Sequence, residues 1–219
     1  MREARRRVTL VTAWNRIFSV AYDPFLWSAE RRGMAEMRRA LLGRARGSVL
    51  EIGAGTGLNL RHYGECVAEI ALVEPDALVH RRLRRRLEAS GLQGSVIGTG
   101  AEALPFPNDS FDAVVSTLVL CTVPNPVTAI AEIVRVLRPG GQLLFIEHVR
   151  GVEGSRRASW QARLHGAWHA FACGCNTNRD TQRVLNDSPL QISDVTEDRW
   201  RGMPPIVQPL IVGAAILPE

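Results

Sequence analysis

The sequence has 219 residues, of which 46% are apolar and 22% are charged, as in an ordinary soluble globular protein. This composition excludes a disordered chain and predicts one domain, large enough to bury a core. All 27 basic residues are arginine, and the net charge of +5 permits attraction to anions without choosing between nucleic acid and lipid. The densest basic run, residues 80–86, falls in a predicted helix whose leucines face inward, so we expect it to be a solvated face.

The first 27 residues combine arginines with an apolar stretch, residues 8–14, that superficially resembles a signal peptide. No cleavage site follows, and the stretch is shorter than the ~20 residues that span a bilayer. We expect an N-terminal helix that caps a ligand pocket through Trp14, Phe18 and Tyr22. The alternative is an amphipathic helix lying on a membrane, with Phe25 and Trp27 also on its apolar side and arginines at the lipid headgroups.

Strands and helices then alternate. A helix is predicted at residues 29–45, with its methionines and leucines on one face. The predicted strands are 49–52, 68–73, 95–97, 113–116, 142–146, 190–196 and 206–214, and the helices between them are 58–63, 76–89, 127–137, 156–171 and 179–187. This order predicts an α/β fold with a parallel sheet and helices on both faces. We expect one structural domain, in which residues 1–47 cap the site and residues 48–219 form the core.

The most informative stretch is the end of the strand at 49–52, where Gly53, Gly55 and Gly57 follow at alternate positions. Glycine suits a loop that approaches a ligand closely, because it lacks Cβ and tolerates positive φ. Glu51 precedes the loop, and Glu74 ends the next strand about twenty residues on, an offset suited to ribose hydroxyls. The fingerprint of a dinucleotide-binding site is G-x-G-x-x-G. This sequence has no glycine at the third glycine position of that pattern, so a dinucleotide site is disfavoured.

The pattern Glu-x-Gly-x-Gly-x-Gly resembles motif I of class I S-adenosylmethionine (SAM) methyltransferases. The resemblance implies a Rossmann-like fold with a mostly parallel seven-stranded sheet and an antiparallel C-terminal strand. It also implies that the loop wraps the methionyl end of SAM and that the second acidic residue holds the ribose. The implied cofactor residues are Glu51, Gly53, Ala54, Gly55, Thr56, Gly57, Glu74, Pro75, Gly100, Ala101, Glu102, Thr117 and Leu118.

Residues 98–106 resemble the segment G-D-A-E-x-L-P-F of small-molecule methyltransferases, in which the aspartate meets the adenine amino group. Gly100 stands where that aspartate would be. We therefore expect adenine to be held by backbone groups around Ala101 and by Glu102.

The segment after the strand at 113–116 is apolar, Thr117-Leu118-Val119-Leu120-Cys121. Enzymes that methylate the amino groups of nucleic acid bases carry an (Asn/Asp)-Pro-Pro-(Tyr/Phe) turn at this place, so its absence makes nucleic acid an unlikely partner. We expect a small apolar acceptor. The predicted pocket residues are Tyr22, Leu120, Cys121, Trp160 and Trp168, with Cys121 as a wall and not a nucleophile.

His148 follows Glu147 at the end of the strand at 142–146, near the expected place of the sulfonium. It is the candidate catalytic base for a thiol, and a structural histidine at a strand end is the alternative. The four cysteines form neither a disulfide framework nor a complete set of metal ligands, so we predict no metal site.

Further pieces resemble the methyltransferase-like seven proteins, SAM-dependent alkyl thiol S-methyltransferases associated with lipid membranes. They are residues 117–121, 135–141, 147–149, 154–156, 160–161, 168, 174–175 and 179–181. The resemblance implies thiol S-methylation. Methylation of a quinol-type ring or a phospholipid headgroup is the alternative, and a non-catalytic membrane or nucleic-acid binding protein is the least favoured. We expect a cytoplasmic protein, with membrane association as the alternative.

Overall fold

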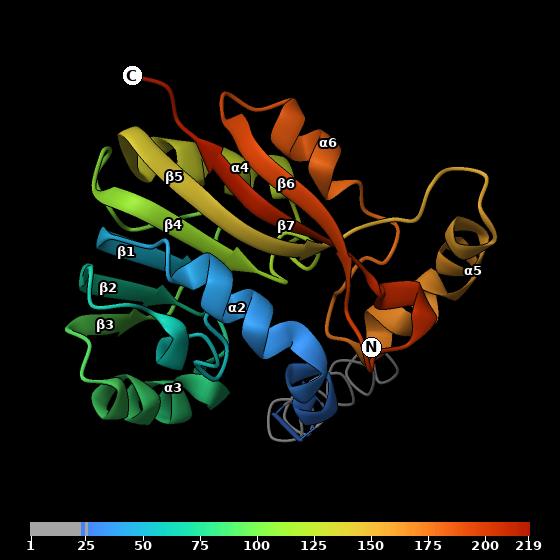
Figure 1. Cartoon of the computed structure of the whole chain (residues 1–219), viewed down its shortest axis with the longest axis horizontal. Helices are drawn as coiled ribbons and strands as arrows, with labels where there is room; N and C mark the ends of the chain where they lie inside the picture. The colour runs from blue at the N-terminus through green and yellow to red at the C-terminus, as the bar shows by residue number, and fades with distance from the viewer. Residues whose placement is uncertain (1–22, 25) are drawn as a thin grey trace, which may run out of the picture.

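The fold is built on a seven-stranded sheet, seen in a computed structural model that describes residues 23, 24 and 26–219 (Figure 1). The strands are β1 (Gly47–Ile52), β2 (Val67–Val73), β3 (Gly94–Ile97), β4 (Phe111–Thr117), β5 (Leu137–His148), β6 (Gln191–Arg199) and β7 (Pro209–Ile216). Their spatial order is β3-β2-β1-β4-β5-β7-β6. The neighbouring strands from β3 to β5 pair in parallel, whereas β7 runs antiparallel to both β5 and β6. The predicted sheet with an antiparallel C-terminal strand is confirmed.

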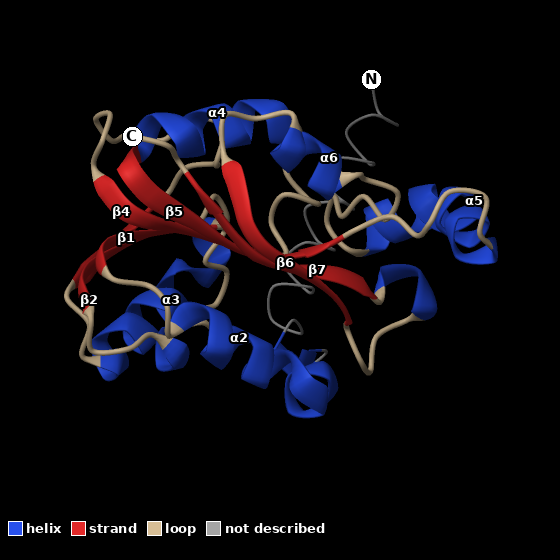
Figure 2. Ribbon diagram, turned by 45° about the horizontal axis from the view of Figure 1, so that its top comes forward, coloured by secondary structure: helices blue, strands red, loops and turns tan. Residues whose placement is uncertain are grey.

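Helices cover both faces of the sheet, as predicted. The α-helices are α2 (Ala35–Leu42), α3 (Ala77–Ser90), α4 (Pro126–Val136), α5 (Arg156–Phe171) and α6 (Thr181–Asn186). Figure 2 shows α2 and α3 on one face and α4 and α6 on the other, whereas α5 stands beyond the edge of the sheet. The core divides accordingly. Leu42 and Leu83 pack on one side of the sheet, and Ile133 and Leu185 pack on the other.

Local sequence signals fix the helix ends. The Asp76 carboxylate accepts a hydrogen bond from the Leu78 N–H and caps α3, which ends at Gly91 in the left-handed conformation. Asn125 caps α4 in the same way, and Pro126 opens that helix. Both helices therefore begin within one residue of their predicted starts.

The chain order places the functional edge. From β1 the chain continues to β2 on one side, and β4 lies on the other side of β1, so the strand order reverses at β1. In open α/β sheets, ligands bind outside the carboxyl ends of the strands at such a reversal. The loops after β1, β2, β4 and β5 all lie at this edge.

Three predicted elements differ from the structure. The predicted helix at 29–45 is broken, because Gly33 has φ +127° inside the π-helical turn η1 (Glu30–Met34) that precedes α2. The predicted helix at 58–63 is only a 3-10 turn, η2 (Leu60–His62). The last strand begins at Pro209, after a second 3-10 turn, η3 (Pro205–Val207). The predicted N-terminal helix lies largely outside the described residues.

Candidate functional site

The loop after β1 has the backbone that only glycine readily adopts. Gly53, Gly55 and Gly57 have φ values of +57°, +54° and +84°. A Cβ on Gly53 would lie 2.5 Å from Val119, and one on Gly57 would lie 2.8 Å from Leu60. A Cβ on Gly55 would meet nothing closer than a backbone oxygen at 4.0 Å. Two of the glycines therefore serve packing, whereas Gly55 faces open space where a ligand can approach the backbone.

Glu74 lies beside this loop, as predicted from its offset. Its two carboxylate oxygens accept hydrogen bonds from the Gly55 N–H and the Asp76 N–H, each at 2.8 Å. Burial raises the pKa of this carboxyl group. The hydrogen bonds hold the carboxylate at the carboxyl end of β2, and each oxygen keeps a lone pair for a ligand hydroxyl. Pro75 follows it on the surface.

A small polar hollow lies at the end of β1. It is lined by Arg38, Glu51, Gly53, Ala54, Gly55, Thr56, Leu58, Asn59 and Thr117, which include six of the predicted cofactor residues. Glu51 accepts hydrogen bonds from the Asn59 amide (3.0 Å) and the Tyr63 hydroxyl (2.6 Å). Burial raises the pKa of Glu51 to about 7, although both hydrogen bonds oppose the rise.

Arg38 is the main residue of this hollow that the sequence analysis missed. It is 4% exposed and pairs with Glu30 at 3.1 Å, and it also donates to the Asn59 side chain. Arginine is almost never buried without a partner, so the buried pair supports a polar site. A buried cation and a buried carboxyl group thus line one hollow beside a glycine loop. No sequence signal separated Arg38 from its neighbour Arg39 in α2.

The loop after β3 is the expected place for adenine. Ala101 is buried, and Gly100 and Glu102 are half-buried. Glu102 accepts a hydrogen bond from the Asn125 N–H at 3.3 Å. Its other oxygen lies 3.1 Å from where a Cβ on Gly100 would be, so the Glu102 carboxylate stands close to the place of the missing aspartate.

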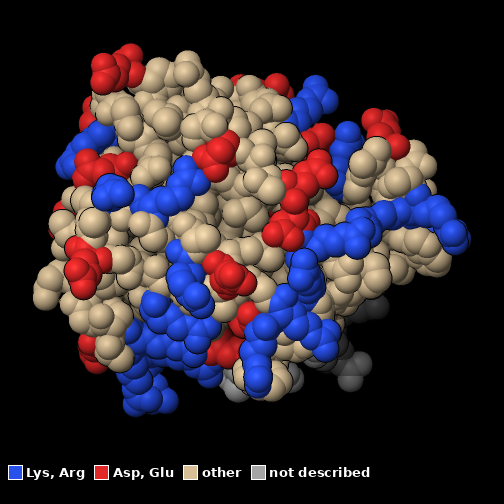
Figure 3. All heavy atoms as spheres, viewed as in Figure 1, with Lys and Arg blue, Asp and Glu red and all other residues tan. Residues whose placement is uncertain are grey.

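Asp23, the first residue that the structure describes, is hydrogen-bonded to the glycine loop. Asp23 accepts a hydrogen bond from the Thr56 hydroxyl at 2.6 Å, and its other oxygen accepts one from Arg86 at 2.7 Å. Arg86 also donates to the Thr56 carbonyl. Arg82 pairs with Asp23 at 3.4 Å, so the basic run is not wholly a solvated face as expected. Figure 3 shows arginines gathered around α3.

The loop after β4 is held by one buried carboxylate. Glu147 accepts hydrogen bonds from the Ser116 hydroxyl (2.6 Å) and from the N–H groups of Val119, Leu120 and Cys121 (3.0–3.3 Å). Burial raises the pKa of Glu147 despite these bonds. Leu118 has φ +61°, an uncommon backbone for a non-glycine residue that this network holds in place.

His148 lies next to that carboxylate and is 1% exposed. Its Nδ1 lies 3.7 Å from the Cys175 sulfur, and its Nε2 is buried without a hydrogen-bond partner among the described residues. The side-chain ligand atoms of Cys121, His148 and Cys175 lie within 4.8 Å of one another. The role of His148 as a catalytic base stays a prediction.

The predicted pocket residues separate into three groups. Cys121 lies with Cys175, whose pKa is lowered first by Cys121 and less strongly by the Trp168 indole. Leu120 is fully buried in the core, whereas Trp160 is 51% exposed. Tyr22 lies outside the described residues. Cys175 thus lies near both Cys121 and Trp168, two members of the predicted set.

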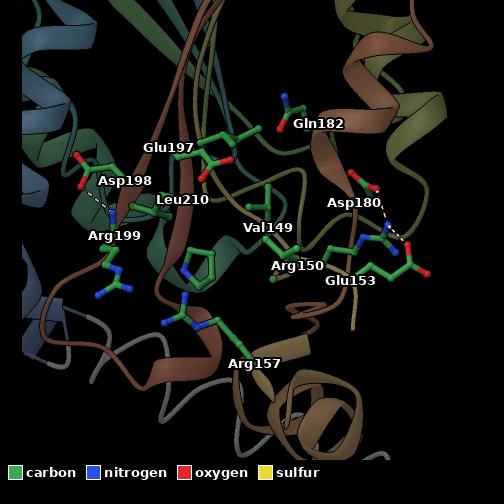
Figure 4. A pocket seen from close by; sticks show the side chains of 14 residues that line it. Val149, Arg150, Glu153, Arg157, Asp180, Gln182, Glu197, Asp198, Arg199 and Leu210 are labelled. Carbon is green, nitrogen blue, oxygen red and sulfur yellow. Dashed lines mark hydrogen bonds and ion pairs between the residues drawn. The ribbon is translucent and has the colours of Figure 1, made fainter. Parts of the chain in front are cut away.

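A larger hollow of about 530 Å³ lies beyond the ends of β5 and β6 (Figure 4). It is lined by charged residues of both signs, and Arg150 pairs there with Asp180 at 3.2 Å and Glu153 at 3.8 Å. Apolar residues such as Val149, Leu210 and Ile211 line it as well, so this hollow does not argue against an apolar acceptor.

Within the described residues, no helix is both long enough and apolar enough to cross a bilayer.

Comparison with known proteins agrees with the geometry. The family model of a methyltransferase domain matches residues 50–145. Human thiol S-methyltransferase TMT1A is 31% identical over 206 residues, 91% of this chain and 82% of that protein. Phosphatidylethanolamine N-methyltransferase of Cereibacter sphaeroides is 30% identical over 152 residues, 68% of this chain and 73% of that protein.

A crystal structure of the N-methyltransferase NodS from Bradyrhizobium japonicum WM9 with S-adenosylhomocysteine has the same fold. Its TM-score is 0.65 at 19% identity, covering 87% of this chain and 88% of NodS. Fold, glycine loop and near full-length sequence similarity agree. The chain therefore belongs to the class I SAM-dependent methyltransferases, in the family of thiol S-methyltransferases TMT1A and TMT1B.

Proposed function

We propose that this protein binds SAM and methylates the sulfur of a small apolar thiol. The observation that carries the SAM part is the hollow at the end of β1, where Arg38, Glu51 and the open backbone of Gly55 meet. A methionyl group carries one ammonium and one carboxylate. Glu51 matches the ammonium and Arg38 matches the carboxylate, so the hollow is complementary to a zwitterion.

The other predicted contacts extend from this hollow along the sheet edge. Glu74 would accept hydrogen bonds from the ribose hydroxyls, since the Gly55 and Asp76 N–H groups already orient its carboxylate. Glu102 and the backbone around Ala101 would meet adenine. We call the hydrogen-bonded group of Asp23, Thr56 and Arg86 the latch. It would hold the segment around Asp23 over the glycine loop and exclude water.

Bound SAM would supply a methyl group on a sulfonium, ready for in-line displacement. The chain then has to align the acceptor and keep water away, which is mainly a positioning task. Val119, Leu120 and Cys121, whose N–H groups are held by Glu147, form an apolar side of the site, and the nearby Arg179 guanidinium is engaged by the Leu120 and Val123 carbonyls. An apolar acceptor fits this side better than a nucleic acid base.

The thiol is favoured by the resemblance to TMT1A over most of both chains. The second candidate is N-methylation of a phospholipid headgroup, favoured by the bacterial relative and by apolar side chains on the surface. Trp27 is 60% exposed, and Trp160, Leu164 and Phe171 on α5 are 38–51% exposed. Among the described residues, exposed Trp27 is the side chain of the N-terminal segment that supports membrane contact.

The test is S-adenosylhomocysteine release by the purified protein with SAM and a panel of acceptors. The panel holds alkyl and aryl thiols, a demethylated quinol and phosphatidylethanolamine vesicles. We expect turnover with the thiols alone. Turnover confined to the quinol or the lipid would overturn the thiol assignment and leave SAM binding standing. Absence of SAM binding by calorimetry would overturn both.

A further inference from the structure

Three side chains with soft ligand atoms meet at the carboxyl edge of the sheet, although they are far apart in the sequence. Cys121 follows β4, His148 ends β5, and Cys175 follows α5. Their ligand atoms lie within 4.8 Å of one another. The Cys175 sulfur and His148 Nδ1 are 3.7 Å apart, and no disulfide joins the two cysteines.

We propose that Cys121, His148 and Cys175 form a binding site for one zinc ion, with two thiolate sulfurs and the imidazole Nδ1 as ligands. In a tetrahedral site with usual zinc–ligand bond lengths, neighbouring ligand atoms lie roughly 3.6–3.8 Å apart. The separation of Cys175 from His148 already has this value. Two ligand atoms of the cluster that are as much as 4.8 Å apart would have to approach by about 1 Å to bind the same zinc ion.

The backbone around the cluster is held independently of any metal. Glu147 binds the N–H groups of the loop that carries Cys121, and Asn176 donates to the Cys121 carbonyl through both its N–H and its side-chain amide. The same amide donates to the Gly174 carbonyl, beside Cys175. The two cysteine loops are therefore bonded to each other through Asn176, so the ligand set is preorganised.

The polar contacts of the His148 ring among the described residues are with the two cysteines of the cluster. His148 is 1% exposed, and Nε2 has no hydrogen-bond partner in the described structure. Its other nitrogen faces a thiol at a distance longer than an ordinary hydrogen bond. Nδ1 is therefore the ring nitrogen that faces the cysteine sulfurs and is placed to ligate a metal. A metal ion between Nδ1 and the two sulfurs would be bound by all three side chains.

The donor set selects the metal. Two sulfurs and one nitrogen suit zinc, whereas magnesium and calcium require oxygen ligands. The one nearby carboxylate, Glu147, already accepts four hydrogen bonds and is not free to ligate. Three protein ligands leave one coordination position, as in zinc sites that bind a water or a small ligand. Cys175, the half-buried member of the set, is the side from which that position is reached.

Zinc binding would change two expectations from the sequence. The cysteines offered no complete set of metal ligands in the sequence, because their positions alone do not show that two loops and a strand end converge. His148 would be a ligand and not the base that deprotonates the acceptor. The site does not depend on the identity of the acceptor, so it can be tested without any turnover.

The test is cobalt titration of the full chain, reduced and stripped of metal with a chelator. We expect one equivalent of Co²⁺ to give sulfur-to-metal charge-transfer absorption and the intense visible bands of a tetrahedral site. One equivalent of Zn²⁺ should abolish both. Cys121→Ser, Cys175→Ser and His148→Ala should each weaken Zn²⁺ affinity more than about 100-fold, since loss of mere outer-shell partners already costs 10–100-fold.

Cys66→Ser and Cys173→Ser are the matched controls, because these cysteines are not part of the cluster. Their cobalt spectra should equal that of the unchanged protein. The zinc site is wrong if no charge-transfer band appears at one equivalent, or if Cys121→Ser and Cys175→Ser both keep it. A band lost equally in Cys66→Ser is also contrary to it. Circular dichroism of each variant shows whether a loss of the band reflects unfolding. Cys175→Ser should disturb folding least, because Cys175 is only half-buried.

Discussion

The two halves of the functional edge are built differently. At the ends of β1 and β2, buried carboxylates are matched by local hydrogen bonds from residues within twenty positions, such as Gly55 to Glu74. At the ends of β4 and β5, the partners come from distant parts of the chain, as Cys121, His148 and Cys175 show. The first half is typical of a cofactor site shared by a whole fold family. The second is the half in which we propose that the acceptor, and so the specific function, is set.

The largest effect is expected at Gly55. A valine there must adopt φ +54° and fills the open space above the loop, so Gly55→Val should weaken SAM binding more than about 1000-fold, roughly 4 kcal/mol. Calorimetric titration measures it. Gly140→Val is the matched control, because Gly140 has φ +75° and open space but lies at the start of β5, away from the site. Unchanged affinity in Gly55→Val would remove the cofactor half from this edge.

The next effect concerns the other half and is structural. In Glu147→Gln the amide cannot accept from all four donors, so at least one buried N–H loses its partner. We expect the free energy of unfolding to fall by about 3 kcal/mol. Denaturant melts measure this. Glu132→Gln is the control, since Glu132 is partly exposed and accepts one backbone N–H, from Leu104. Equal losses in both variants would mean that Glu147 is not the special support of this half.

A pH effect sharpens the cofactor half. The pKa of Glu51 is raised to about 7, so the carboxyl group is mostly protonated below that pH and ionises as the pH rises through it. Only the ionised form pairs with an ammonium. SAM affinity should therefore rise roughly tenfold between about pH 5.5 and pH 7. In Glu51→Gln the affinity should be lower at pH 7 and nearly flat over this range. A flat profile in the unchanged protein would show that Glu51 does not bind the ammonium.

The smallest effect is expected at the latch. Asp23→Asn weakens ion pairs with Arg86 and Arg82 that are partly exposed to solvent, so SAM affinity should fall only about threefold. The difference should shrink in high salt, which screens exposed pairs. Asp194→Asn is the control, because Asp194 pairs with Arg44 at exposed positions away from the loop. A loss of SAM affinity as large as that in Gly55→Val would mean that the segment around Asp23 is itself part of the SAM site.

Much of the fold could be predicted from the sequence, because its signals are local. The alternation of strand and helix patterns along the chain predicted the order of elements, and the caps Asp76 and Asn125 in the structure agree with the predicted helix starts. The failures occurred where local and tertiary demands differ. Residues 58–63 have a helical pattern, yet Asn59 and Tyr63 turn their side chains to Glu51 and only a short 3-10 turn forms. The break at Gly33 depends on a backbone angle that glycine permits but its presence does not require.

The sequence by itself predicted the proposed cofactor half, because a glycine loop and an acidic residue at a fixed offset follow two consecutive strands, β1 and β2, that pair in parallel. Only the tertiary structure placed Arg38 in the hollow, brought Asp23 to Thr56, and assembled two cysteines and a histidine at the other half. These contacts join segments that the sheet order, not the chain order, makes neighbours. The residues supply the side-chain chemistry, but the order of the strands in the sheet decides which side chains meet.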